Sequence, residues 1–311
     1  MTFPASHNYD VVGLGVSTVD ILALVEHFPT GDDTQPALAM GVQGGGPVAS
    51  ALAALARLGA RTAMLDALGD DWRARQILDE FAALGVETRF IVRRPGQSSG
   101  LASILVQAGS GQRAIVYSPK NAGDLLPEEL PAALVQGARF LHLNGRHWAA
   151  CLHAADLARQ AGVRVSFDGG AGRYRPDLRQ LLPLADICIV ARAFAAEYTA
   201  CDAIRPAAQA LLTEGPSLVV ITDGINGSWV FPKAAGSFHQ PAFCMPQVVD
   251  TTGCGDAYHG AFLFGLLRGL PLPQTAALAS AVAALNSQAL GGRAALPSLP
   301  QVEAFLRAQV G

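Results

Sequence analysis

Lysine is nearly missing from this 311-residue sequence: only Lys120 and Lys233 occur among its 22 basic residues. A P-loop requires a lysine directly after its last glycine, whereas each of these two lysines follows a proline. A Walker-type nucleotide site is therefore excluded. Charged residues make up only 15% of the chain and the net charge is −3, so we expect no partner surface for nucleic acid or acidic membranes.

Cysteine and long apolar runs are also scarce. The five cysteines are scattered and form no C-x-x-C pair, which argues against a disulfide framework or a zinc site. The most apolar stretch, Gly260 to Leu267, meets Arg268 long before the ~20 residues of a membrane span. The first nine residues lack the pattern of a signal peptide. We therefore expect a cytoplasmic protein.

Half of the residues are hydrophobic, and short apolar runs alternate with helical patterns along most of the chain. Such alternation predicts a doubly wound α/β fold, in which a mostly parallel sheet carries helices on both faces. The expected strands are 9–14, 62–68, 140–143, 163–167, 187–190 and 218–221. The expected helices are 47–58, 72–84, 149–160, 194–199 and 206–212.

Two stretches break this alternation. Residues 21–42 follow the first strand without a crossover helix, and residues 99–117 contain two extended runs around a turn rich in Gly and Ser. We expect a small β-sheet lid, inserted at about 17–43 and 97–121, that stands off the main sheet of one domain spanning 1–311.

The run from Asp250 to Asp256, Asp-Thr-Thr-Gly-Cys-Gly-Asp, carries the strongest chemical signal and leads into an apolar helix. Gly253 and Gly255 let main-chain N–H groups converge at a helix N-terminus, which favours an anion. A carboxylate there would repel a phosphate, so Asp256 is unexpected in a site that only binds phosphate. It is explained if Asp256 accepts a proton from a hydroxyl that attacks the phosphoryl group. The alternative is a glycine turn with Asp256 as the helix N-cap.

Two further signals lie near the N-terminus. Gly44, Gly45 and Gly46 precede Pro47, which suits the first turn of a helix, and the glycines let a polar ligand approach the backbone. The alternative is a flexible entry to an Ala-rich packing helix. Asp20 is a lone acid within an apolar run; a carboxylate there can bind two hydroxyls of a polyol or start a turn.

Together these motifs resemble the ribokinase-like (PfkB) family of carbohydrate kinases over nearly the whole chain. The matching residues are Gly44, Gly45 and Ser50 for G-G-x-x-x-N, Asp250 to Asp256 for D-T-x-G-A-G-D, and Thr222, Gly224 and Gly227 for T-x-G-x-x-G. The resemblance implies transfer of the γ-phosphate of ATP to a sugar hydroxyl, with Mg2+ and with K+ as a candidate. It also implies a lid over the sugar, through which a homodimer can form.

The resemblance also implies roles for residues. Asp256 is the general base, and the amides of Gly253, Cys254 and Gly255 form the anion hole. Sugar binding falls to Asp20, Gly44, Gly45 and Ser50, ATP binding to Thr222, Gly224, Gly227, Asn286 and Gly292, and a monovalent-cation loop to Asp250 and Thr252. Ser50 stands where the family carries Asn, which shortens the reach toward the sugar.

Three short runs, 44–47, 118–119 and 291–294, resemble a subgroup that contains sulfofructose kinases and ketohexokinase-like enzymes. Arg146 stands where the sulfosugar enzymes carry an anion-binding Arg, but Asp32 and Asp33 stand where they carry a Lys, so a sulfonate would meet negative charge there. Lys120 is another candidate for binding an anionic group of the substrate. The sequence leaves the identity of the sugar open.

The family's N-x-x-E motif, which helps to organise Mg2+, reads Ala191-Arg192-Ala193-Phe194 here. Neither Ala nor Phe can bind the water shell of a metal. Glu197, one turn further on, is a candidate replacement; alternatively, Mg2+ is held chiefly by the ATP phosphates and water.

Two other classes of function compete with a kinase. The missing N-x-x-E residues are the one feature that favours a non-catalytic sugar- or nucleotide-binding protein of the same fold. The run from Gly13 to Thr18, Gly-Leu-Gly-Val-Ser-Thr, begins the fingerprint of a Rossmann-type oxidoreductase. Its third position is Thr18 instead of Gly, however, and no helical pattern follows at once.

Overall fold

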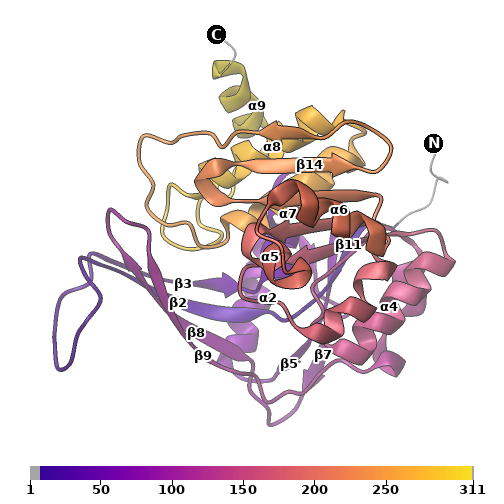
Figure 1. Cartoon of the computed structure of the whole chain (residues 1–311). Helices are drawn as coiled ribbons and strands as arrows, with labels where there is room; N and C mark the ends of the chain where they lie inside the picture. The colour runs from indigo at the N-terminus through magenta and orange to yellow at the C-terminus, as the bar shows by residue number, and fades with distance from the viewer. Residues whose placement is uncertain (1–7, 310–311) are drawn as a thin grey trace.

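A computed structural model describes residues 8–309. The main sheet consists of β1 (Tyr9–Leu14), β4 (Thr62–Leu65), β6 (Val86–Glu87), β10 (Ala138–Leu143), β11 (Arg164–Gly169), β12 (Ile187–Ala191), β13 (Leu218–Thr222), β14 (Ser228–Pro232) and β15 (Phe238–Gln240). Its order is β15-β14-β13-β12-β11-β10-β1-β4-β6 (Figure 1). The strands from β13 to β6 are parallel, and β14 and β15 extend the sheet antiparallel.

Helices cover both faces of this sheet, as the alternation of elements predicts. They are α1 (Pro47–Arg57), α2 (Trp72–Leu84), α3 (Ala132–Gln136), α4 (Trp148–Gln160), α5 (Arg192–Thr199), α6 (Ile204–Glu214), α7 (Cys254–Leu267), α8 (Leu272–Asn286) and α9 (Leu299–Ala308). Neighbouring strand residues point to opposite faces: Val11 packs in the cluster with α1, α7 and α8, and Val12 in the cluster with α4, α5 and α6. The doubly wound fold is confirmed.

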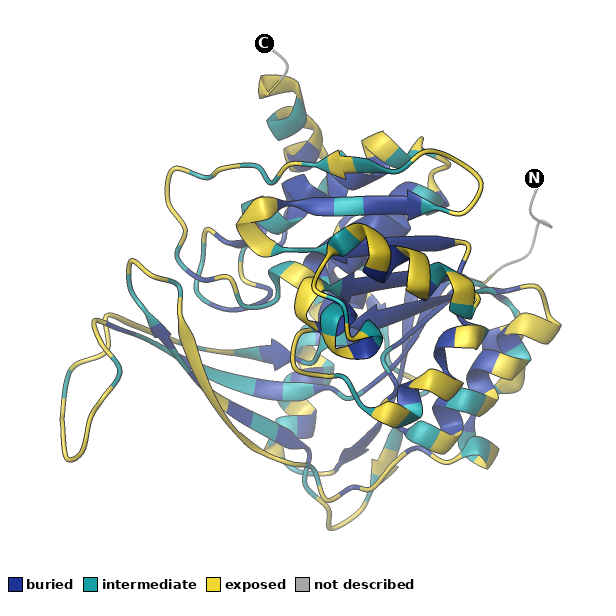
Figure 2. Cartoon of the chain, viewed as in Figure 1, coloured by how far each residue is buried: buried dark blue, intermediate teal, exposed yellow. Residues whose placement is uncertain are grey.

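A small sheet stands off the main body. It consists of β2 (Thr18–Val25), β3 (Ala39–Gly45), β8 (Gly100–Gln107) and β9 (Arg113–Ser118), in the order β3-β2-β8-β9. Figure 1 shows it projecting to one side, with a long loop between β2 and β3 extending further out. Its β9 strand is exposed along its whole length (Figure 2), including Val116 and Tyr117.

The predicted strand 62–68 is interrupted at Asp66. The chain leaves the main sheet after β4, and β5 (Ala67–Gly69) pairs with β7 (Val92–Arg94) instead. The fully buried Asp66 carboxylate accepts hydrogen bonds from the backbone N–H groups of Ser17 at 2.7 Å and Ala67 at 2.7 Å. A polar group that needs these partners cannot continue a plain apolar strand.

The sequence patterns assigned no element beyond Leu267, whereas α8 and α9 follow it in the structure. Of the helices between residues 8 and 309, none has the length and apolar character required to cross a membrane.

Candidate active site

The turn before α7 has the backbone geometry that its glycines predict. Gly253 has φ +70°, in the left-handed region, and a Cβ there would lie 2.5 Å from Cα of Gly292. Gly253 is the N-cap of α7, and Asp256 is the third residue of the helix. The alternative interpretation of Asp256 as the N-cap is therefore wrong. The first N–H groups of α7 have no acceptor within the helix; that of Cys254 donates to the carbonyl of Thr251 at 3.3 Å.

Burial and neighbouring charge raise the pKa of the half-buried Asp256 carboxyl. Desolvation is the largest cause, and the carboxylate of Asp168 adds to it, whereas Arg173, His259 and Arg293 oppose it. Burial also raises the pKa of the adjacent Cys254 thiol to about 12. Cys254 is therefore protonated near neutral pH, and Asp256 is the group of this turn that can accept a proton.

A second loop packs against this turn and is tied to it by Asp250, which is fully buried. Oδ1 of Asp250 accepts from the N–H of Thr252 at 2.8 Å, and Oδ2 accepts from the N–H of Gly291 at 2.8 Å. Asn286 donates from Nδ2 to the carbonyl of Gly292 at 3.0 Å. These contacts bring together the residues predicted for the monovalent-cation loop and part of the nucleotide site.

Asp20 lies on β2 directly against the glycine-rich segment. A Cβ at Gly45 would lie 2.1 Å from Oδ2 of Asp20, so only glycine leaves room for this carboxylate. Thr18 donates from Oγ1 to Oδ1 of Asp20 at 2.9 Å. Burial raises the pKa of Asp20; the charge of Asp256 raises it further, while Arg293 lowers it. The charge of Asp256 thus acts on the pKa of Asp20.

Arg293 is the main residue of this region that the sequence patterns missed. Its guanidinium donates to Oγ of Ser50 at 3.0 Å, to the carbonyl of Gly45 at 2.8 Å and to Oε1 of Glu80 at 3.1 Å. The side chain is only 3% exposed. Arg293 follows the glycine pair 291–292. Its positive charge directly after two glycines was the one feature of the sequence that could have indicated it.

Gln43 on β3 is a second residue that the patterns did not indicate. Its Nε2 donates to the carbonyl of Leu290 at 3.1 Å, and its Oε1 accepts from the N–H of Arg293 at 2.8 Å. The backbone of Gly44 donates to Glu80. The small sheet is therefore joined to the loop at 290–293, and through it to the turn at Gly253.

The two basic residues predicted to bind an anionic group of the substrate, Lys120 and Arg146, lie in different surroundings. The nearly buried Lys120 donates from Nζ to Oδ1 of Asp66 at 3.1 Å and to the carbonyl of Ala67 at 2.9 Å. Nε2 of His147 lies 2.9 Å from the same Oδ1. The Lys120 ammonium is thus engaged in a buried network, and Arg146 is exposed on the surface. Their roles in substrate binding remain predictions.

The segment that is predicted to bind the nucleotide follows β13. Thr222 ends that strand, and Gly224 and Gly227 have φ +52° and +86°. A Cβ at Gly227 would lie 2.2 Å from the carbonyl oxygen of Gln240, so the turn requires glycine there. Between the two glycines, Ile225 is 85% exposed, which leaves an apolar side chain free at the tip of the turn.

Residues at the place of the N-x-x-E motif do not form a metal site. Phe194 is buried in the core and Glu197 is exposed on α5. Between residues 8 and 309, a single group of three His, Cys, Asp or Glu side chains has converging ligand atoms, and it is His142, Asp168 and His259. The described side chains therefore do not supply a carboxylate cage for Mg2+ beside Asp256.

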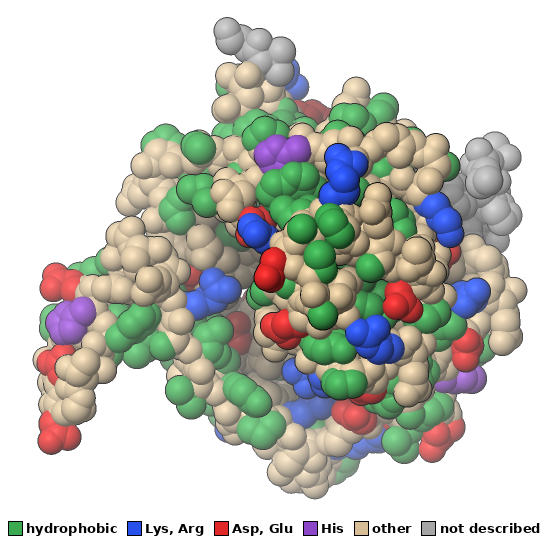
Figure 3. All heavy atoms as spheres, in the orientation of Figure 1, with side chains coloured by type: hydrophobic (Ala, Val, Ile, Leu, Met, Phe, Trp, Pro, Cys, Tyr) green, Lys and Arg blue, Asp and Glu red, His purple; other side chains and the backbone are tan. Residues whose placement is uncertain are grey.

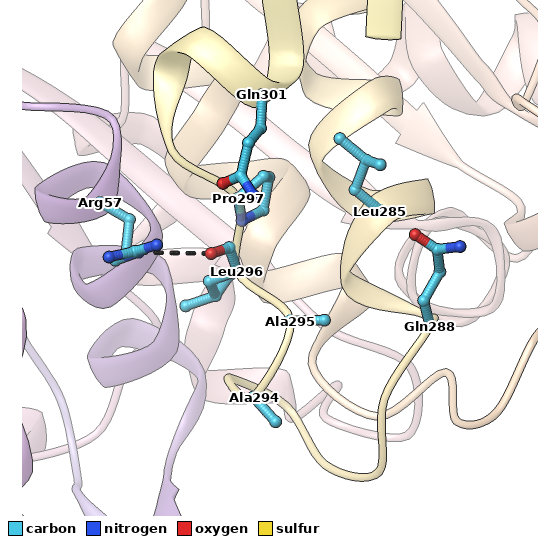
Figure 4. Close-up of a pocket in the computed structure, with 8 residues that line it drawn as sticks. All are labelled: Arg57, Leu285, Gln288, Ala294, Ala295, Leu296, Pro297 and Gln301. Carbon is cyan, nitrogen blue, oxygen red and sulfur yellow. Dashed lines mark hydrogen bonds between the residues drawn. The ribbon is translucent and has the colours of Figure 1, made fainter.

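The surface is hollowed between the small sheet and the main body (Figure 3). A separate cavity of about 290 Å3 lies behind the loop at 290–297. Its lining residues come from α1, α8, α9, Gln288 and residues 294–297, and Arg57 donates to the carbonyl of Leu296 at 3.3 Å across it (Figure 4). Neither Asp20 nor Asp256 lines this cavity, so it is distinct from the candidate site.

The oxidoreductase interpretation of residues 13–18 is contradicted by the fold. The chain passes from β1 directly into β2, whereas a dinucleotide fingerprint requires a helix whose N-terminus faces the pyrophosphate. No helix begins at this turn.

Comparison with known proteins points to the same family that the sequence motifs resemble. A family model described as "pfkB family carbohydrate kinase" matches residues 8–299. The chain is 28% identical to 5-dehydro-2-deoxygluconokinase of Shouchella clausii over 99% of this chain and 98% of that protein. It is 30% identical to an uncharacterized sugar kinase of Archaeoglobus fulgidus, over 78% of this chain and 98% of that protein.

Solved structures have the same fold. Arabidopsis thaliana ribokinase, complexed with ribose and ATP, superposes with a TM-score of 0.84 at 24% identity and covers 96% of this chain and 99% of its own. Ribokinase of Giardia lamblia gives 0.85 at 22% identity and covers 97% of this chain and all of its own. The arrangement of the main and small sheets is therefore shared with these structures.

Proposed function

Because this chain belongs to the pfkB family of carbohydrate kinases, we propose that it transfers the γ-phosphoryl group of ATP to a sugar hydroxyl, with Asp256 as the general base. The observation that carries the proposal is the place of Asp256. It lies in the first turn of α7, beside amides that can bind an anion, and within electrostatic reach of Asp20.

In the proposed reaction, the Asp256 carboxylate accepts the proton of the sugar hydroxyl as its oxygen bonds to the γ-phosphorus, and the bond from that phosphorus to the β–γ bridging oxygen breaks to release ADP. The main-chain N–H groups of Gly253, Cys254 and Gly255 stabilise the charge that develops on the transferred group. Asp20, Gly45 and Ser50 bind the sugar. Because no covalent intermediate is involved, positioning and charge stabilisation supply the rate.

The nucleotide is proposed to lie across the C-terminal half, along Thr222, Gly224, Gly227, Asn286 and Gly292. The exposed Ile225 offers an apolar contact for the base. Since the described side chains form no carboxylate cage near Asp256, Mg2+ is expected to arrive with the phosphates of ATP, whose charge it neutralises. Glu197 remains only a candidate contact to its water shell.

A monovalent cation suits the loop at Asp250. This carboxylate is fully buried, and no Lys, Arg or His pairs with it among the described residues. Its two oxygens accept backbone hydrogen bonds, but a buried charge with no opposite charge beside it remains costly. Oγ1 of Thr252 is buried without a hydrogen-bond partner in the described structure. We propose that K+ binds here, held by oxygen atoms of this loop.

We further propose that the small sheet, at 18–45 and 100–118, is a lid that covers the sugar. The narrower relation to sulfofructose kinases and ketohexokinase-like enzymes remains a prediction, because the relatives named above carry other substrate names. That relation rests on the runs at 44–47, 118–119 and 291–294.

The test is a measurement of ADP release over ketohexoses, pentoses, nucleosides, sugar phosphates and sulfosugars, each with ATP, Mg2+ and K+. The proposed function predicts saturable ADP release and a phosphorylated product with at least one class. ATP and sugar binding without product across the panel would favour the non-catalytic alternative.

A further inference from the structure

Three buried polar side chains converge beneath the candidate active site. His142 comes from β10, Asp168 from β11 and His259 from the second turn of α7, one turn after Asp256. Their exposed fractions are 0%, 3% and 4%. One nitrogen of each imidazole and one carboxylate oxygen all lie within 4.8 Å of one another.

These groups have unused hydrogen-bonding capacity. Nε2 of His142, Oδ2 of Asp168 and Nδ1 of His259 are buried without a hydrogen-bond partner in the described structure. Nε2 of His259 lies 3.8 Å from Oδ1 of Asp168. Leaving a buried polar atom unpaired is unfavourable, so three neighbouring side chains that each hold such an atom favour a further ligand in this cluster. The nearest cation, Arg173, has its Nη1 3.8 Å from Oδ2 of Asp168, and its side chain is 40% exposed.

The orientation of His142 suits a ligand. Its Nδ1 lies 3.2 Å from Oγ of Ser166, so Nδ1–H can donate to that hydroxyl and leave the Nε2 lone pair free. Metal-bound imidazoles commonly donate their second N–H in this way.

We propose that His142, Asp168 and His259 bind one divalent transition-metal ion of the Zn2+ class, at a site separate from the Mg2+ that accompanies ATP. Two imidazoles and one carboxylate are ligands that suit Zn2+, Co2+ or Fe2+, whereas Mg2+ prefers oxygen. Three protein ligands leave a further position for water. Metal–ligand distances near 2.0–2.2 Å require the three side chains to draw together by a small movement.

The proposal is tested by titrating the chelator-treated, full-length protein with Co2+ and recording its visible absorption. We expect ligand-field bands that saturate at one Co2+ per chain and are bleached by one equivalent of Zn2+. Asp168→Asn, which is nearly isosteric, and His259→Gln should lose these bands. His153→Gln, at an exposed position of α4, is the matched control and should keep them.

Two further measurements separate a metal from a trapped water and from misfolding. Zn2+, but not Mg2+, should raise the Tm of the unmutated protein. Ser166→Ala should weaken Co2+ binding about 10–100-fold, the range found when an outer-shell partner is removed. Absence of saturable Co2+ binding, no Tm shift by Zn2+, or bands unchanged in both Asp168→Asn and His259→Gln would overturn the proposal. None of these readouts depends on turnover, so they stand apart from the proposed kinase activity.

Discussion

Replacing Arg293 by Met should destabilise the protein by about 3–5 kcal/mol, the cost of breaking a buried ion pair by removing one partner. The guanidinium donates to Ser50, to the carbonyl of Gly45 and to Glu80. Each hydrogen bond of a charged group is worth about 1.5–3 kcal/mol. Their plain sum overstates the loss, because the Glu80 side chain is 17% exposed and gains water when its partner is removed.

The assay is urea unfolding followed by circular dichroism, with Arg75→Met as the control. Arg75 is exposed on α2, the helix that also carries Glu80, and its replacement should change stability by less than about 0.5 kcal/mol. In a double-mutant cycle, Glu80→Gln and Arg293→Met should show a coupling energy of about 0.5–3 kcal/mol.

The same substitution should also affect binding. Arg293 holds Ser50 and Gly45, which are proposed to bind the sugar, so Arg293→Met should raise the KM of the sugar more than that of ATP. A destabilisation below about 1 kcal/mol, or strict additivity with Glu80→Gln, would refute the interpretation of Arg293 as the bridge between the C-terminal loop and the sugar-binding segment.

Three further predictions follow from other contacts. Asp20→Ala should raise the KM of the sugar about 10–150-fold, since a charged hydrogen bond contributes roughly 1.5–3 kcal/mol, with little change for ATP; equal rises for both substrates would contradict the assignment. In the buried network of Asp66, Lys120 and His147, burial acts to raise the pKa of Asp66, but His147 and Lys120 outweigh it and lower that pKa. Burial likewise acts to lower the pKa of His147, but Asp124 and Asp66 outweigh it and raise that pKa. The contribution of Asp66 to stability is therefore present above its unfolded pKa of 3.8 and lost as pH falls through its lowered folded pKa, whereas that of His147 is present below 6.5 and lost as pH rises through its raised folded pKa. Urea unfolding should therefore find Asp66→Asn most destabilising at about pH 5–6. A loss of stability that does not depend on pH would be inconsistent with this network. Finally, if the lid pairs in a homodimer, Tyr117→Arg on the exposed face of β9 should halve the mass measured by light scattering, whereas an unmutated monomer would exclude the dimer.

Much of the fold could be predicted because its strands and helices are encoded locally. The apolar runs predicted β1 and the strands from β10 to β13 with bounds that differ from the structure by only a few residues. Gly85 ends α2 with φ +78°, as a glycine at a helix C-terminus predicts. The strand at 62–68 was only partly right, because Asp66 finds its partners at Ser17, Lys120 and His147. Nothing in the local pattern reveals these contacts.

In the candidate site too, local motifs predicted some features and missed the long-range contacts. The glycine turn before Asp256 and the approach of Gly45 to Asp20 follow from short motifs, because glycine is required where the backbone is left-handed or closely approached. Arg293 contacts Ser50 across 243 positions of the chain, and no periodicity or spacing reports such a pair. Lys120 remains a predicted substrate contact, and its hydrogen bond to Asp66 could not be predicted from the sequence.

The central claim is that Asp256 deprotonates the attacking hydroxyl, and the kcat of Asp256→Asn tests it most directly. The proposed base must be a carboxylate to accept the proton, and the pKa of Asp256 is raised above 3.8. On this proposal, kcat of the unmutated enzyme should fall with decreasing pH at a higher pH than an ordinary Asp would cause. Asp256→Asn should lower kcat about 10²–10⁴-fold while ATP still binds with nearly unchanged Kd. Turnover within a few-fold of the unmutated enzyme would contradict the account.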